Sequence, residues 1–208
     1  MPRKSPYDLG IGLLLVLVAL GASKGSSKRR PRDVRWSDDD MRAFQRAVEA
    51  SGVPVDIALH VYASESGLDP AASSGSSWGL PQFIEQTLRG LGYRGTPSSF
   101  GALSVAEQSP WVERLLKSQV AYLGRVPRDA VDLYALNFWP AAAKRGDDAV
   151  VVRDSRDGRE RAAYVANATL DRSRKGYISR DDLQTSLNRV AKLPALVRAR
   201  EQIRRLAA

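Results

Sequence analysis

Apolar residues recur every three or four positions through most of the stretch from residue 37 to residue 137, which is the spacing of one helix face. Met41, Phe44 and Val48 show this pattern near its start. No alternating apolar and polar run of strand length stands out in the stretch. The pattern therefore predicts a nearly all-α domain, with helices over residues 37–51, 53–66, 83–90, 103–123 and 128–137.

Local signals set the ends of these helices. Ser37 precedes three aspartates, and a serine followed by acids in the first turn favours a helix start. Gly67 and the Asp69-Pro70 pair end the second helix, because proline disfavours the helical conformation of the residue before it. Residues 92–101 hold four glycines or prolines and are predicted to form a loop.

The first 35 residues follow a different pattern. Residues 9–22 are an apolar run of fourteen, preceded by Arg3 and Lys4 and followed by a Ser/Gly/Lys/Arg segment. As a helix this run would span about 21 Å, less than a hydrocarbon core of about 30 Å, which also suits the apolar region of a signal peptide. The basic segment behind it resists translocation, which favours an uncleaved anchor over residues 1–22, with a flexible linker over 23–35.

Residues 170–183, near the C-terminus, resemble a single EF-hand-type loop. Asp171 takes the first position, Gly176 the sharp turn and Asp182 the last. Lys175 occupies a ligand position, so the resemblance is to a degenerate loop, and no metal is expected there.

The rest of the C-terminal segment carries an amphipathic helical pattern rich in arginine. Apolar residues recur from Leu183 to Leu206, and Pro194 should kink or divide the helix. Its apolar face is expected to pack on the domain, and binding of a membrane surface or a partner is the alternative. Residues 151–208 are thus predicted to be a basic helical extension of a domain over 36–150.

Charge separates the chain into three parts. The 208 residues carry a net charge of +9 and include no cysteine, which excludes disulfides and thiolate chemistry. Residues 1–35 hold eight Lys/Arg against two Asp/Glu, residues 36–150 hold ten against fourteen, and residues 151–208 hold fourteen against seven. The basic flanks would suit a membrane, nucleic acid or an acidic partner. No nucleic-acid-binding motif accompanies them, so nucleic acid is not an expected partner.

The chemistry of the domain centres on Glu65, a single carboxylate near the end of the second predicted helix. A Ser/Gly loop over 73–77 and an amide-bearing turn over 78–83 follow it. A carboxylate at a helix end that faces such a loop and turn can be presented to a substrate groove. The alternative interpretation is an ordinary solvated glutamate at a helix end. His60, the single histidine, lies five residues earlier, points off the face of Glu65 and is interpreted as structural.

Three motifs occur in order around this carboxylate. Residues 65–66 are Glu-Ser, and residues 79–82 read Gly-Leu-Pro-Gln. Residues 135–142, Ala-Leu-Asn-Phe-Trp-Pro-Ala-Ala, follow after a helical segment at 103–113. Together they resemble the soluble lytic transglycosylase and goose-type lysozyme family, which has Glu-Ser, Gly-Leu-x-Gln and Ala-Tyr-Asn-Ala-Gly-Pro-Gly-Ala. The resemblance covers about residues 40–150 and implies a lysozyme-like helical domain. The segment at 103–113 resembles a linker helix of phage-borne members of the family.

The resemblance also implies a reaction, cleavage of the β-1,4 bond between MurNAc and GlcNAc in peptidoglycan. Glu65 would act as general acid and then as base, its pKa raised by apolar surroundings. The second carboxylate of hydrolytic glycosidases is not evident, because Asp69 is expected in a turn and Glu85 on a solvated face. This favours a lytic transglycosylase, in which the substrate's N-acetyl group and C6 hydroxyl leave a 1,6-anhydro sugar. No cofactor is implied.

Five residues are expected to bind the substrate. Gln82 and Asn137 match the family's substrate-contacting amides, with capping of a backbone group as the open alternative for each. Ser66 directly follows the acid in the sequence, and Trp78 has an aromatic face for a sugar, with packing in the core as its alternative. A leucine stands where the third motif has tyrosine, and Tyr134, two residues earlier, is expected to supply the missing hydroxyl.

The expected partners are peptidoglycan, a membrane through the N-terminal segment, and other virion proteins. The protein is expected to be membrane-associated and to act on the cell wall from the periplasmic side. It is expected to be a virion component, with a cellular enzyme as the alternative. The altered third motif favours a second possibility, an inactive lysozyme-like structural or adaptor protein. A hydrolytic muramidase is the third.

Overall fold

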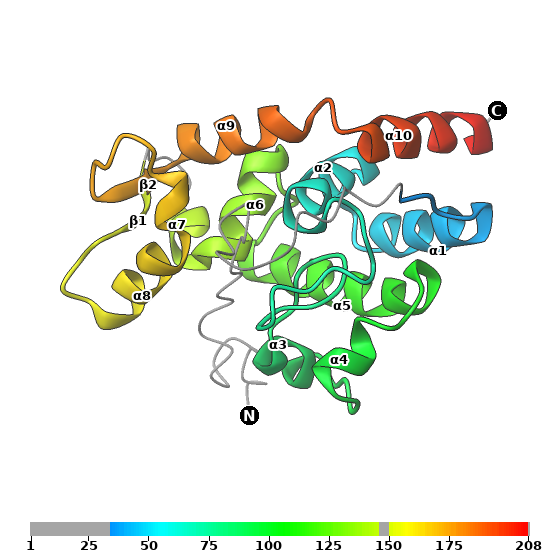
Figure 1. Cartoon of the computed structure of the whole chain (residues 1–208), viewed down its shortest axis with the longest axis horizontal. Helices are drawn as coiled ribbons and strands as arrows, with labels where there is room; N and C mark the ends of the chain where they lie inside the picture. Colours follow the sequence, from blue (N-terminus) through cyan, green and yellow to red (C-terminus); the bar gives the residue numbers. More distant parts are fainter. Residues whose placement is uncertain (1–33, 146–149, 208) are drawn as a thin grey trace.

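The computed structural model describes residues 34–145 and 150–207, and these residues form a mainly helical protein (Figure 1). The helices are α1 (Asp38–Glu49), α2 (Val55–Ser66), α3 (Glu85–Gly90), α4 (Pro97–Phe100), α5 (Val105–Leu123), α6 (Ala130–Phe138), α7 (Pro140–Arg145), α8 (Gly158–Asn167), the 3-10 helix η1 (Ala168–Leu170), α9 (Arg180–Val190) and α10 (Pro194–Ala207). The prediction of a mainly α protein is confirmed.

The N-terminal predictions fall mostly outside this description. The predicted anchor, residues 1–22, lies outside the described residues, as does nearly all of the linker over 23–35. Within the two described ranges, no helix is long and apolar enough to cross a membrane.

The helix ends follow from the local signals. The Ser37 hydroxyl accepts from the Asp40 N–H at 3.0 Å, and the Asp40 carboxylate accepts from the Ser37 backbone, a capping box that begins α1. The predicted loop over 92–101 is only partly a loop, because α4 lies inside it. There the Thr96 hydroxyl caps the Ser99 N–H, and Pro97 at the first helical position lacks the N–H that would need a partner.

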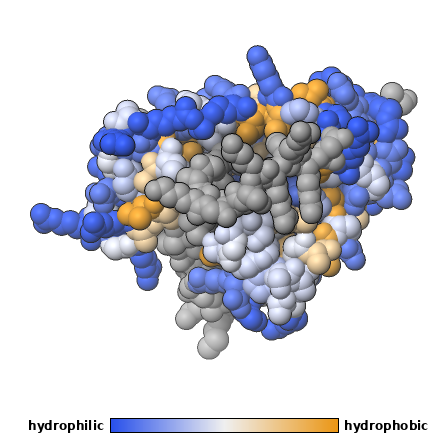
Figure 2. Space-filling view, viewed as in Figure 1, coloured by the Kyte–Doolittle hydropathy of each residue, from blue (hydrophilic) through white to orange (hydrophobic). Residues whose placement is uncertain are grey.

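A continuous core joins the domain to its extension. The side of α9 that carries Leu183 and Leu187 packs on α2 and α6, and α10 packs on α1 and α2 (Figure 1). The chain breaks between the two helices at Pro194, as predicted. In Figure 2 the outer edge formed by α9 and α10 is mostly hydrophilic. The predicted boundary at residue 150 therefore does not separate two hydrophobic cores.

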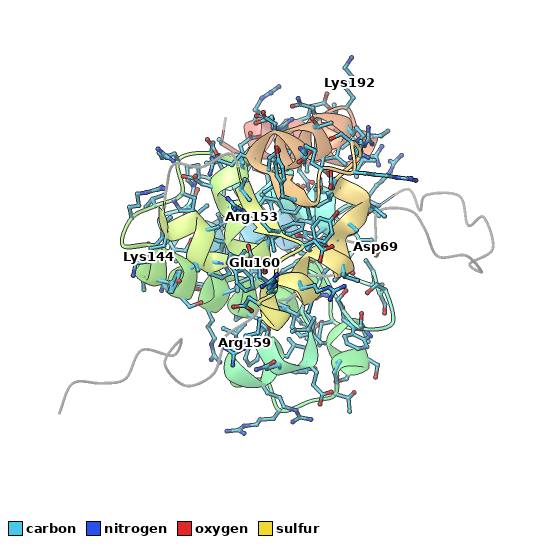
Figure 3. The ribbon with its side chains drawn as sticks, turned by 90° about the vertical axis from the view of Figure 1, so that its left-hand side faces the viewer. Asp69, Lys144, Arg153, Arg159, Glu160 and Lys192 are labelled. Atoms are coloured by element: carbon cyan, nitrogen blue, oxygen red, sulfur yellow. The ribbon has the colours of Figure 1, made fainter. Side chains whose placement is uncertain are left out.

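Two short strands were not predicted. β1 (Val150–Arg153) pairs antiparallel with β2 (Tyr177–Ser179), with Val152 opposite Ile178. Runs of three or four residues are too short for an alternating pattern to stand out, which is why the sequence does not reveal them. In Figure 3 this end of the molecule faces the viewer, and the Arg153 N–H donates to Glu160 Oε1 at 3.1 Å.

Candidate active site

Glu65 lies in the last turn of α2, next to an abrupt helix end. Gly67 adopts the left-handed conformation with φ of 65°, and its N–H donates to the Ala63 carbonyl oxygen at 3.1 Å. Leu68 follows, also with φ of 65°. Glycine takes this conformation without the steric cost of a Cβ. The predicted helix stop is confirmed, and it leaves Glu65 on the final turn, facing α6.

The Glu65 carboxyl is buried, with 8% of the residue exposed. Its Oε1 accepts a hydrogen bond from Asn137 Nδ2 at 3.3 Å, while Oε2 is buried without a hydrogen-bond partner among the described residues. Burial raises the pKa of Glu65 to about 8, and the hydrogen bond from Asn137 opposes that rise. A carboxyl in this environment holds its proton at neutral pH, which is the state a general acid needs.

Two buried phenols adjoin the carboxyl. Burial, and then the charge of Glu65, raises the pKa of Tyr62 on α2 and of Tyr134 on α6 above the usual value. The Ser64 hydroxyl donates to the Tyr134 oxygen at 3.2 Å, and the Tyr134 ring packs edge-on against Phe138. Tyr134 is fully buried. It lies in the core, and this position supports a packing role for Tyr134 over contact with a sugar.

Gln82 holds the loop that follows α2. Its Oε1 accepts from the Ser77 hydroxyl at 2.8 Å, and its Nε2 donates to the carbonyl oxygens of Gly79 at 2.9 Å and Ala72 at 3.2 Å. The residue is buried and has a positive φ of 52°. Both its nitrogen and its oxygen are bonded inside the loop, so its position supports the structural alternative over contact with a sugar.

Ser66 and Trp78 are half-buried. The Ser66 hydroxyl donates to the Tyr62 carbonyl oxygen one turn earlier at 3.0 Å, a bond within α2. Trp78 and Phe83 pair through their backbones, at 2.8 and 2.9 Å, which closes the turn. Of the predicted amides and hydroxyls, Asn137 is the one with a hydrogen bond to the Glu65 carboxyl.

The other two carboxylates take the roles that were expected of them. Asp69 accepts from the Ala71 N–H at 2.9 Å in a turn, and in Figure 3 it lies at the opposite side of the molecule from Lys144. Glu85 is exposed and pairs with Arg89 at 2.7 Å. Each of them is thus engaged in a local contact of its own turn or helix.

His60 is structural, as interpreted. Its Nε2 lies 2.9 Å from the Leu187 carbonyl oxygen and so links α2 to α9.

Sequence reasoning missed Gln119, which is buried on α5 and donates to Asn137 Oδ1 at 2.7 Å. The sequence did contain a signal for the burial of this glutamine. Gln119 lies between Leu116 and Leu123 on the apolar face of its helix, and a glutamine at such a position must find a buried polar partner. Tyr62 was assigned to the apolar stripe of α2, and its hydroxyl is buried without a hydrogen-bond partner in the described part of the chain.

The EF-hand-like loop is closed by protein groups. The Asp171 carboxylate accepts from the backbone N–H groups of Lys175 at 2.9 Å and Gly176 at 2.8 Å. The Lys175 ammonium contacts Asp182 Oδ2 at 2.8 Å, so its charge faces the last carboxylate of the loop. In residues 34–145 and 150–207, no group of three or more His, Cys, Asp or Glu side chains could hold a metal ion.

Comparison with known proteins finds no matching family model, no matching curated protein and no matching solved structure. The functional interpretation therefore depends on the residues and geometry of this chain.

Proposed function

We propose that this protein is a lytic transglycosylase that cleaves the MurNAc-GlcNAc β-1,4 bond of peptidoglycan, with Glu65 as its acid and base. The observation that carries the proposal is the buried carboxyl at the end of α2, whose pKa burial raises to about 8. The order of the three sequence motifs and the mainly helical fold agree with a lysozyme-like domain.

The proposed reaction has two proton transfers. Protonated Glu65 donates from its carboxyl to the glycosidic oxygen, and the bond to the MurNAc C1 atom breaks. The resulting carboxylate, stabilised by the Asn137 N–H, then removes the proton of the MurNAc C6 hydroxyl as that oxygen attacks C1. The product is a 1,6-anhydro sugar, and Glu65 is protonated again. Because the substrate supplies the attacking hydroxyl, this route needs no second carboxylate.

One structural requirement follows. Oε2 of Glu65 is buried, so the side chains around it must move before a glycan oxygen can reach the acid. The same burial supports the second candidate function, an inactive lysozyme-like structural or adaptor protein in which Glu65 only completes the core. The burial of Tyr134 and the three hydrogen bonds of Gln82 inside its loop also support this second candidate.

The location is part of the proposal. We place the protein at a membrane through its N-terminal segment, on the periplasmic side, where it acts on the wall as a virion component. The apolar run over residues 9–22 and the basic residues behind it support this placement.

Digestion of purified peptidoglycan distinguishes the candidates. Anhydro-muropeptides formed by the wild-type protein and absent with Glu65→Gln would support the transglycosylase. Reducing-end products would indicate a hydrolytic muramidase. A folded protein that binds the wall but releases no product would favour the adaptor.

A further inference from the structure

Gln119, on a third helix, is connected to the proposed acid through Asn137. It lies on α5, is 2% exposed, and donates from Nε2 to Asn137 Oδ1 at 2.7 Å. Asn137 on α6 in turn donates from Nδ2 to Glu65 Oε1 at 3.3 Å. The two amides form a directed chain of hydrogen bonds from α5 to the carboxyl at the end of α2.

The direction of this chain matters because the two ends of an asparagine amide differ. Its N–H group stabilises an ionised carboxylate, whereas its carbonyl oxygen would accept a hydrogen bond from a protonated one. In the structure Gln119 Nε2 donates to the Asn137 oxygen and the Asn137 nitrogen faces Glu65, while Gln119 Oε1 is buried without a hydrogen-bond partner among the described residues. Without the Gln119 donor, the Asn137 amide could turn its oxygen toward protonated Glu65 and hold the proton more firmly.

We propose that Gln119 is a positioning residue for Glu65, because it keeps the nitrogen of the Asn137 amide directed at the carboxyl. The proposal rests on the proposed function, in which one carboxyl first gives and then takes a proton. Such a group works best when its pKa lies near the operating pH. Burial moves the pKa of Glu65 upward, and the hydrogen bond that Gln119 orients opposes that movement.

The other titratable and charged groups around Glu65 do not supply this opposing effect. Tyr62 of α2 and Tyr134 of α6 are buried phenols, and the charge of Glu65 raises the pKa of both. Arg189 of α9 acts on Tyr134. Two arginines of α10, which packs on α1 and α2, are bound to carboxylates: Arg200 to Asp56 and Arg205 to Asp38.

The test is a titration of Glu65 in the full-length protein. NMR of isotopically labelled side-chain carboxyl carbons follows the group, and its signal is assigned by its loss in Glu65→Gln. Gln119→Met keeps the approximate volume and removes the donor, so we expect the titration midpoint to rise by about one pH unit. Ser109→Ala is the matched control, because it removes a buried hydrogen bond of 2.8 Å on the same helix without touching Asn137. Its midpoint should equal that of the wild-type protein.

An unchanged midpoint in folded Gln119→Met overturns the proposal, whatever the protein does to a glycan. If that variant does not fold, Gln119→Asn, which withdraws the amide by one methylene, is measured in its place. Asn137→Leu tests the route of the effect. In that background Gln119→Met should produce no further shift, and an undiminished shift would overturn the role assigned to Asn137.

Wall digestion separates this inference from the proposed function. If the wild-type protein cleaves peptidoglycan, the alkaline limb of its pH–rate profile should move upward in Gln119→Met by the same amount as the midpoint. A fixed limb beside a shifted midpoint would overturn the link to catalysis. A shifted midpoint in a protein that never cleaves peptidoglycan would support the positioning role and refute the proposed function.

Discussion

Replacing Glu65 by glutamine should change how the stability of the protein depends on pH. Burial raises the pKa of Glu65 to about 8 from an ordinary value of 4.5. Between these values the folded protein binds more protons at this site than the unfolded chain does. The stability that the protonated group contributes is therefore fully present below about pH 4.5. It is lost progressively as the pH rises from there to about 8. Glu65→Gln lacks this loss.

The magnitude follows from the two pKa values. One pKa unit corresponds to about 1.4 kcal/mol, so the wild-type protein should lose about 2.5 kcal/mol of unfolding free energy between about pH 5 and about pH 7 through this group alone. The Gln variant keeps a side chain of the same size in the same buried position. Its unfolding free energy, relative to that of the wild-type protein, should thus rise by about 2.5 kcal/mol over this interval.

Urea unfolding followed by tryptophan fluorescence measures the difference, with equal urea dependence required in both proteins. Glu49→Gln is the control, since it removes the same charge from an exposed position at the end of α1. The difference from the wild-type protein should change more with pH for Glu65→Gln than for Glu49→Gln. Parallel curves of unfolding free energy for Glu65→Gln and the wild-type protein from about pH 5 to about pH 7 would show that the pKa of Glu65 is not raised in the folded protein.

Two further predictions concern the stability contributed by Asp132 and by Gln82. Burial alone would raise the pKa of Asp132, but hydrogen bonds from Arg128, Arg125 and Arg180 hold it below its usual value. Asp132→Asn should lower the unfolding free energy by about 3 kcal/mol near neutral pH. The difference between variant and wild-type protein should narrow below about pH 4, because protonation removes the stability that the ionised carboxyl contributes. A difference that does not change with pH would contradict the role given to this carboxylate. Gln82→Ala should lower the unfolding free energy by about 2 kcal/mol, because three hydrogen bonds are lost. If the variant instead keeps its thermal stability and loses glycan binding, Gln82 is a substrate-binding residue.

The sequence predicted the helices best where a cap, a stop and an apolar stripe agreed. Ser37 and Gly67 are local signals, and both act as predicted. The apolar face of the C-terminal segment predicted that α9 and α10 pack on the domain. It did not predict which helices they pack against. The strands β1 and β2 escaped detection because their pairing joins segments that are far apart in the sequence and individually short.

The site was predictable in its centre and not in its surroundings. Motif order identified Glu65 and Asn137, and the structure brings the two together. Motif order could not show that Tyr134 lies inside the core, because burial depends on which face α6 presents to α2 and α9. Gln119 belongs to no motif. Its contact with Asn137 joins two helices, and only their packing shows it.

The most direct test of the central claim is the mass of the products released from purified peptidoglycan by the full-length protein, beside Glu65→Gln. We expect anhydro-muropeptides from the wild-type protein and a rate lower by about 100-fold or more in the variant, because the variant lacks the general acid. Equal rates in the two proteins, or no release by a wild-type protein shown to be folded and bound to the wall, would contradict it.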